Sequence, residues 1–214
     1  MGKVRFTARE LAELVGASVA VAAIYTIALS RMAGLNPPFS LKAFAVLALP
    51  WIAGNVFFHE LAHALVADAL GYEGRFKVNL AMLVVGFAVA FTSGFFFTTP
   101  GAVSVKGNPP KKDMALIAFV GPFTDLLIAV LALSFLPAFV ADEFVFSWLA
   151  SGALLSLSLA LWNALPLGVT DGTYVLSGMP LLGAAFAVSV AGLYGYAYST
   201  VAETLKTLLT IILT

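Results

Sequence analysis

Five long stretches of the chain are almost entirely apolar, and each is long enough to cross the hydrocarbon core of a bilayer, which takes about 20 helical residues. Turn-forming residues interrupt the apolar pattern, such as Asn36-Pro37-Pro38 after the first stretch and Gly71 after the second. The apolar tail at 201–214 is too short to cross untilted. The pattern predicts an all-α polytopic membrane protein with about five to six transmembrane helices. The five predicted spans are roughly 11–33, 43–70, 113–136, 145–165 and 179–199.

A sixth apolar segment, 78–98, is harder to interpret because it carries Gly86 and Gly94. It either crosses once or enters and leaves by the same face. The positive-inside rule separates these alternatives, since it places Lys and Arg on the cytoplasmic side. A single crossing divides the basic residues between the two sides, whereas a hairpin gathers most of them opposite the acidic loop 137–144. The basic residues gathered by the hairpin are Lys3, Arg5, Arg9, Arg75, Lys77, Lys106, Lys111 and Lys112.

The charges therefore favour a re-entrant or β-hairpin-like segment near 78–103. Non-helical backbone at membrane depth needs cover from protein or from a water-filled cavity. The hairpin interpretation therefore also predicts a cavity beside this segment.

The composition agrees with a membrane protein. Hydrophobic residues make up 61% of the chain and charged residues 10%, whereas about a quarter of a soluble domain is charged. The net charge is zero, and no basic run is long enough to indicate a nucleic-acid partner. The absence of cysteine excludes disulfides and thiolate ligands. We expect one integral membrane domain over 1–214, with core spans at about 43–70, 113–136 and 145–172.

The chain has only two histidines, His59 and His63, which lie in the second predicted span with Glu60 between them. Residues four apart share one face of a helix, so both imidazoles can reach one metal ion, and the Glu can contact a water beside it. Ionisable groups in hydrocarbon cost roughly 2.5–3.5 kcal/mol each, and a metal is the simplest compensation. The spacing is typical of zinc hydrolases. A structural polar contact between helices is the alternative.

An open zinc site needs a third protein ligand, which here has to be acidic. Asp68 lies five residues beyond His63 and points about 140° away from it, so we expect it at the membrane interface. Asp171 follows the broken end of the fourth span, and the hairpin topology brings that end to the same face as the end of the second. Asp125, inside the third span, is either the third ligand instead or a hydrogen-bonding contact between helices.

The chain resembles the site-2 proteases, which are intramembrane zinc metalloproteases. The resemblance covers the three core spans and rests on three separated motifs in the family's order. These are His59-Glu60-Leu61-Ala62-His63, then Pro100-Gly101-Ala102-Val103 ahead of Gly121-Pro122-Phe123-Thr124, and finally Asn163-Ala164-Leu165-Pro166 followed by Asp171-Gly172.

The resemblance implies one Zn²⁺ per chain held by His59, His63 and Asp171, with Glu60 as general base and Asn163 near the substrate carbonyl. It also implies transmembrane protein substrates cut within the lipid bilayer, a multi-pass location in the cell membrane and an active site nearer the cytoplasmic face. We expect a compact prokaryotic or archaeal member without a PDZ domain. An inactive homologue, or a metal-binding scaffold or transporter, is the alternative function.

The sequence departs from the family's pattern at Asp125, where Asn is usual. By the resemblance alone, exchanging Asp125 for Asn is expected to leave metal binding and cleavage nearly intact.

Overall fold

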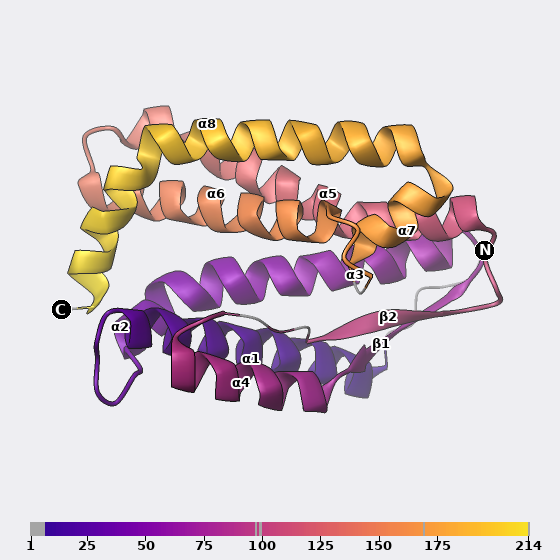
Figure 1. Ribbon diagram of the computed structural model, residues 1–214, viewed down its shortest axis with the longest axis horizontal. Coiled ribbons are helices and arrows are strands. Elements are labelled where there is room, and N and C mark those ends of the chain that lie inside the picture. The colour runs from indigo at the N-terminus through magenta and orange to yellow at the C-terminus, as the bar shows by residue number, and fades with distance from the viewer. Residues whose placement is uncertain (1–6, 97, 99, 169, 214) are drawn as a thin grey trace.

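The computed structural model describes residues 7–96, 98, 100–168 and 170–213, without the side chains of 201–207. Helices make up most of the molecule and run largely along one long axis (Figure 1). The elements in chain order are α1 (Ala8–Met32), α2 (Leu41–Ala43), the π-helix η1 (Phe44–Ala53), α3 (Gly54–Ala69), β1 (Glu73–Val78), α4 (Leu80–Ser93), β2 (Gly101–Lys106), α5 (Lys111–Phe135), the 3₁₀-helix η2 (Leu136–Phe139), α6 (Glu143–Ala164), α7 (Asp171–Gly178) and α8 (Pro180–Leu213).

Five helical stretches in the described residues are long and apolar enough to cross a membrane, and their ends lie within three residues of the predicted spans. The expected all-α polytopic fold is therefore confirmed. The candidate span of α8 ends at Thr200, and α8 continues as one helix through the apolar tail, where its far end bends toward α2 (Figure 1). There Leu208 and Ile212 are buried against Ala43 and Leu47. The apolar tail thus buries its side chains against the second span.

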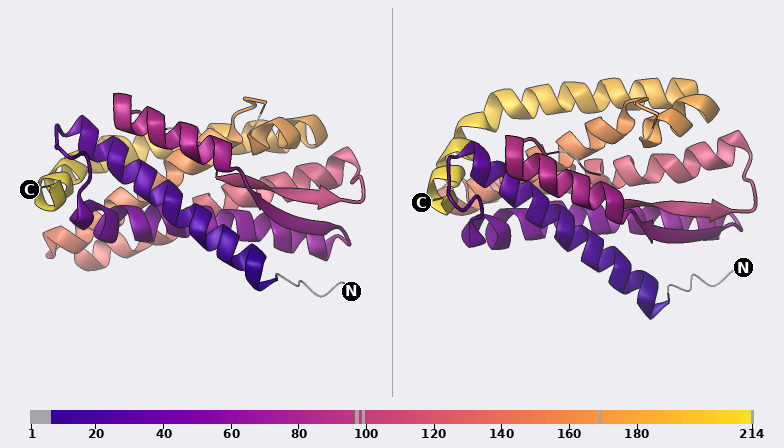
Figure 2. Two further views of the ribbon diagram at one scale, coloured as in Figure 1. Left: turned by 90° about the horizontal axis from the view of Figure 1, so that it is seen from below. Right: turned by 60° about the horizontal axis from the view of Figure 1, so that its bottom comes forward.

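The helices form two layers with α3 between them. One layer contains α5, α6, α7 and α8, and the other contains α1, α4 and the two strands (Figures 1 and 2). The larger core cluster joins α5, α6 and α8 and includes Ala129, Leu157 and Val190. A second cluster joins α1 to the second span through Val21 and Ile52. Both faces of α3 are thus covered by protein, which allows it to carry polar groups.

Two contacts with α6 fix the rotation of the second span. The indole of Trp51 lies against Gly152, where an added Cβ would come within 2.0–2.3 Å of the ring. One turn later, Asn55 Nδ2 donates a hydrogen bond to Ser156 Oγ at 2.9 Å. Residues 51, 55, 59 and 63 are spaced by four and lie along one side of the helix. These contacts therefore also orient the two histidines.

The segment between the second and third spans is a hairpin, as its charges predict. Strands β1 and β2 are antiparallel, with Glu73 opposite Lys106 and Val78 opposite Gly101, so the chain returns to where it left. Between them α4 packs along α1 (Figure 2). With 14 residues, α4 is about 21 Å long, too short to cross the hydrocarbon core alone. The two strands approach closely at Gly101, where an added Cβ would lie 2.2 Å from the Lys77 carbonyl oxygen.

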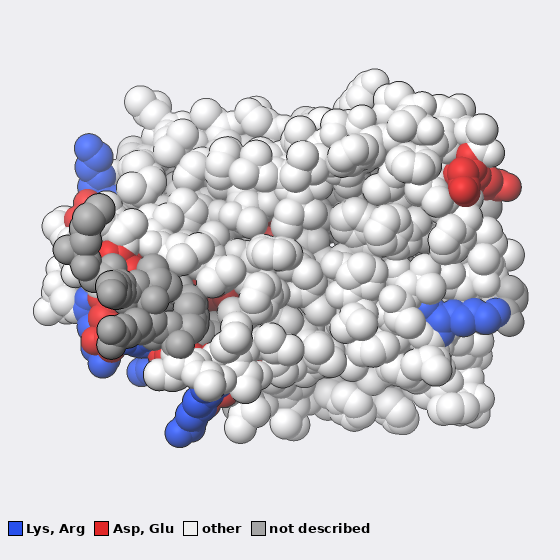
Figure 3. Space-filling model, turned by 180° about the vertical axis from the view of Figure 1, so that it is seen from behind, with Lys and Arg blue, Asp and Glu red and all other residues white. Residues whose placement is uncertain are grey.

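Charged side chains gather at the two ends of the molecule, and the broad middle of the face in Figure 3 is almost all uncharged. At one end the hairpin contacts the start of α1, where Arg75 lies 3.4 Å from Glu10. At the same end Tyr72 Oη donates a 2.6 Å hydrogen bond to Asp113, in the first turn of α5. Asp142 caps α6 at the opposite end of α5. Lys3 and Arg5 lie outside the described residues.

Candidate metal centre

Helix α3 places His59, Glu60 and His63 inside the molecule, where all three are at most 8% exposed. The two imidazole rings stand edge to face, with their centroids 4.7 Å apart. The four-residue spacing produces this arrangement directly, because it corresponds to slightly more than one helical turn. The pair is therefore a local consequence of the sequence, while its surroundings come from distant segments.

Asp171 reaches the histidines from the beginning of α7. After α6 ends at Ala164, the chain turns, and the turn is held by a hydrogen bond from the Thr170 hydroxyl to the Leu165 carbonyl and by one from Gly168 N to Thr173 Oγ1. Asp171 then begins α7, with one oxygen, Oδ2, 3.1 Å from His59 Nε2 and 3.4 Å from His63 Nε2.

The tautomer of each imidazole follows from its other nitrogen. His63 Nδ1 lies 2.6 Å from the backbone carbonyl oxygen of Ile117, and His59 Nδ1 lies 2.8 Å from Asp125 Oδ2. A carbonyl or carboxylate oxygen accepts hydrogen bonds, so each Nδ1 carries the hydrogen. In a neutral imidazole Nε2 then presents a lone pair. Both lone pairs face the Asp171 carboxylate, an arrangement that a cation bound between the three groups would satisfy.

The donor set fits zinc. Two imidazole nitrogens and one carboxylate form a three-ligand site of the kind that catalytic zinc uses. Their donor atoms all lie within 4.8 Å of one another. In a tetrahedral zinc site with metal–ligand bonds of about 2.0–2.1 Å, neighbouring donor atoms are about 3.3 Å apart. The two nitrogen-to-oxygen distances, 3.1 and 3.4 Å, lie on either side of that value.

Helix α5 comes close to the donor atoms because it has glycine at the contact. A Cβ added at Gly121 would lie 2.4 Å from His63 Nε2 and 2.6 Å from His59 Nε2. Pro122 follows and has no N–H to donate to the carbonyl of Ala118, so the helix ladder is interrupted beside the site. The accepting carbonyl of Ile117 lies in the same turn. Sequence reasoning singled out the Gly-Pro pair as a motif but missed Ile117 altogether.

The remaining acidic candidates do not join the donor group. Asp68 is partly exposed, and its Oδ1 accepts a 3.3 Å hydrogen bond from Gly74 N. Asp125 is 1% exposed and contacts the far nitrogen of His59, on the opposite side of the ring from the Asp171 contact. Of the three carboxylates considered from the sequence, Asp171 alone stands beside both Nε2 atoms.

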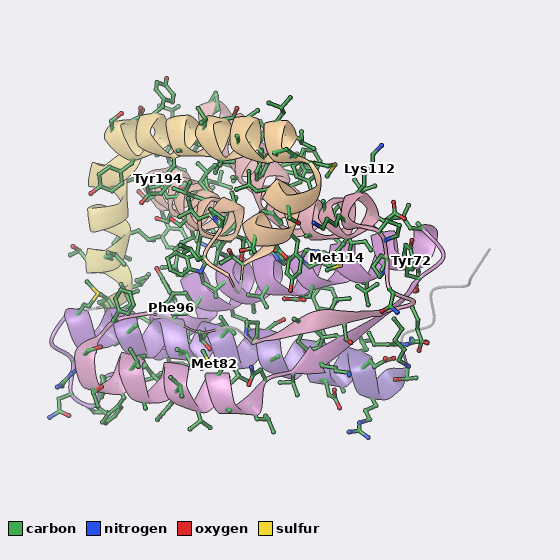
Figure 4. The ribbon with its side chains drawn as sticks, turned by 45° about the vertical axis from the view of Figure 1, so that its right-hand side comes forward. Tyr72, Met82, Phe96, Lys112, Met114 and Tyr194 are labelled. Carbon is green, nitrogen blue, oxygen red and sulfur yellow. The ribbon has the colours of Figure 1, made fainter. Side chains whose placement is uncertain are left out.

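A cavity of about 1110 Å³ opens from the site toward the hairpin. Glu60 and Asn163 both line it, as does the edge of β2 from Gly101 to Ser104. Two apolar side chains also line the cavity: Phe96 from the segment that follows α4, and Met114 from α5 (Figure 4). The structure thus contains the cavity that the hairpin interpretation predicts. Its volume is large enough for more than a single side chain.

Comparison with known proteins identifies two relatives. The "Putative zinc metalloprotease MJ0611" of Methanocaldococcus jannaschii is 28% identical, over 88% of this chain and 94% of that protein. The "Putative zinc metalloprotease YwhC" of Bacillus subtilis is 30% identical, over 74% of this chain and 79% of that protein. No family model matches the chain. No solved structure matches it at a significant level.

These relatives match most of the chain, and the described residues combine a buried His, His and Asp group with apolar helices long enough to cross a membrane. The chain therefore belongs to the site-2 protease-like family of multi-pass membrane zinc metalloproteases.

Proposed function

We propose that the protein is an intramembrane zinc endopeptidase that cuts peptide bonds in or near the transmembrane segments of other membrane proteins, as in regulated intramembrane proteolysis. One observation carries the proposal: two imidazole nitrogens and a carboxylate oxygen lie within 4.8 Å of one another at a cavity lined by apolar helices and by the hairpin. His59, His63 and Asp171 would hold one zinc ion per chain. Bound there, zinc would supply a Lewis acid that polarises the peptide carbonyl.

Glu60 is the general base in this proposal. It follows His59 directly and lines the same cavity, where it can accept a proton from the attacking water and return it to the leaving amine. Its Oε2 atom is buried and has no hydrogen-bond partner among the described residues, so no structural contact occupies it. Asn163 lines the cavity as well, and its amide can donate a hydrogen bond to the carbonyl oxygen as charge develops there.

The proposed substrates are single-span membrane proteins bound in extended form. A helical segment already uses its carbonyls in hydrogen bonds, so it has to unwind before a peptide bond can be attacked. The described sheet has two strands, and β2 pairs on one edge with β1. Residues 101–104 of β2 line the cavity. An unwound segment could therefore satisfy its backbone groups by adding as a further strand at that edge.

The charge distribution supports a location in the cell membrane with the site nearer the cytoplasm. The basic residues of the hairpin and of the start of α5 lie at the end of the molecule where α3 finishes. His63 precedes the end of α3 by six residues, which is about 9 Å along the axis. By the positive-inside rule, this arrangement supports a metal group closer to the cytoplasmic surface.

The test is cleavage of a model single-span substrate by the purified full-length protein in lipid nanodiscs. We expect Glu60→Gln to keep zinc and fold but to lower the cleavage rate about a hundredfold to ten-thousandfold, since it preserves shape and removes basicity. Glu13→Gln is the matched control, because it makes the same exchange on α1, where Glu13 pairs with the exposed Arg9. This variant should cleave normally. Chelation should abolish cleavage, and added zinc should restore it. Cleavage by Glu60→Gln at the parental rate would refute the proposal.

A further inference from the structure

Asp125 makes a contact that neither zinc binding nor catalysis as proposed above employs. It lies on α5, is 1% exposed, and directs Oδ2 at His59 Nδ1 from 2.8 Å. The other nitrogen of that ring faces Asp171. His59 is therefore held between two carboxylates, one on the side of the donor group and one behind the ring.

The two histidines differ in what stands behind them. His63 donates its Nδ1 hydrogen to a backbone carbonyl, that of Ile117, which is neutral. His59 donates to a carboxylate, which carries a charge and accepts more strongly. A carboxylate behind a metal-binding imidazole fixes its orientation and strengthens it as a ligand. The two ligands, although four residues apart on one helix, are therefore not equivalent.

Helix packing alone is a poor explanation of Asp125. Its second oxygen, Oδ1, is buried and has no hydrogen-bond partner among the described residues. A buried carboxylate with one bare oxygen costs free energy, and an amide or an apolar side chain would join the helices at lower cost. A nearby divalent cation changes this balance, because its two positive charges offset the negative charges of Asp125 and Asp171.

We propose that Asp125 is a positioning residue that acts through His59: it fixes the ring with Nε2 toward the metal and strengthens zinc binding without touching the ion. This inference rests on the zinc site of the proposed function. It replaces the expectation from family resemblance that exchanging Asp125 for Asn is harmless, because that expectation did not include the contact with His59.

The experiment measures zinc affinity of the purified full-length protein by competition with a chromophoric chelator. Asp125→Asn keeps the size and an accepting oxygen but removes the charge, whereas Asp125→Ala removes both. We expect affinity to fall about tenfold in the first and up to about a hundredfold in the second. Asp113→Asn is the matched control, since it makes the same exchange on the same helix but beside Tyr72, and its affinity should equal the parental value.

Two further readouts separate positioning from packing. Thermal unfolding of the metal-free protein should be unchanged or raised in Asp125→Asn, because the exchange removes a buried charge. With Co²⁺ in place of zinc, the visible absorption bands should shift in Asp125→Asn and stay constant in Asp113→Asn. A packing role predicts the reverse, with lowered stability of the metal-free protein and unshifted bands, and that result would overturn the inference.

The outcomes also separate this inference from the proposed function. If the parental protein binds zinc and both Asp125 variants bind it equally well, the role of Asp125 is refuted and the zinc site stands. If the parental protein and His59→Ala bind zinc equally, the assignment of the site is refuted, and the role of Asp125 with it.

Discussion

The exchange Gly121→Ala tests the site geometry most directly, because it adds a single methyl group. That carbon would lie 2.4 Å and 2.5 Å from Nε2 and Cε1 of His63, and 2.6 Å from Nε2 of His59. All three separations are below 3.0 Å, which real Cβ atoms essentially never show. The methyl group would also occupy space on the side of the rings where both Nε2 lone pairs point. It therefore competes with a metal as well as with the rings.

The expected magnitude follows from how the clash can be relieved. Overpacking a tight core by one carbon typically costs about 1–3 kcal/mol of folding free energy. If the rings swing away instead, His63 loses its hydrogen bond to Ile117 and His59 loses its contact with Asp125, and each buried polar group left unpaired costs about 1–3 kcal/mol. Either route moves the donor atoms apart. We therefore expect folding to survive in weakened form and zinc content to fall to a small fraction of one ion per chain.

The assay compares zinc per purified chain and the unfolding midpoint in detergent for Gly121→Ala and Gly16→Ala. Gly16 lies on α1 with nothing within 4 Å of its added Cβ, so alanine there should leave zinc unchanged and stabilise the helix by roughly 0.5–1 kcal/mol. A Gly121→Ala protein that retains one zinc per chain and cleaves substrate normally would show that α5 does not approach the histidines as described.

Two other expectations concern the ligand from α7 and the opening of the hairpin. Asp171→Asn should lower zinc content to less than half and abolish cleavage, as measured by metal analysis and the nanodisc assay; unaltered zinc content would mean that another group is the third ligand. Glu73 accepts hydrogen bonds from Arg75 and Lys106, and these two contacts hold the pKa of its carboxyl below the ordinary 4.5. A lowered folded pKa means that its contribution to hairpin stability is present above pH 4.5 and lost as the pH falls through the folded value. The protection of the β1 amides, measured relative to the intrinsic exchange rate at each pH, should therefore fall more on acidification in the parental protein than in Glu73→Gln. An equal fall in the two proteins would show that the ion pair is not the cause.

The membrane spans could be predicted from sequence because the signal is additive. Each span carries about twenty apolar residues, so no single side chain decides it. The hairpin could be predicted because charges flank it: a single crossing would have separated Lys106, Lys111 and Lys112 from Arg75. The paired histidines could be predicted since their spacing and the helix period together determine their geometry.

The contacts between elements that are distant in the chain could not be predicted from the sequence. The contact of His63 with Ile117 joins residues 54 positions apart, and no side-chain type marks it, because the acceptor is backbone. The need for glycine at 121 depends on how closely α5 approaches α3, which only packing determines. Asp125 and Asp171 have the same side chain, and their different partners depend on the side from which each helix meets His59. The continuation of α8 through the tail likewise depends on a docking surface provided by α2.

The placement of the donor group gives the metal a mechanical role in the fold. Two donors lie on one helix, and the third lies 112 residues further along the chain. A metal shared by His59 and Asp171 would close that long loop and act as a cross-link, in a chain that has no cysteine for a disulfide. Helix α3 has its own backbone hydrogen bonds and neighbours on both faces, whereas the described residues of the turn, 165–168 and 170, make hydrogen bonds only with residues close by in the chain. Removing the metal would therefore loosen that turn first, and a protease added from outside would cut the metal-free protein there.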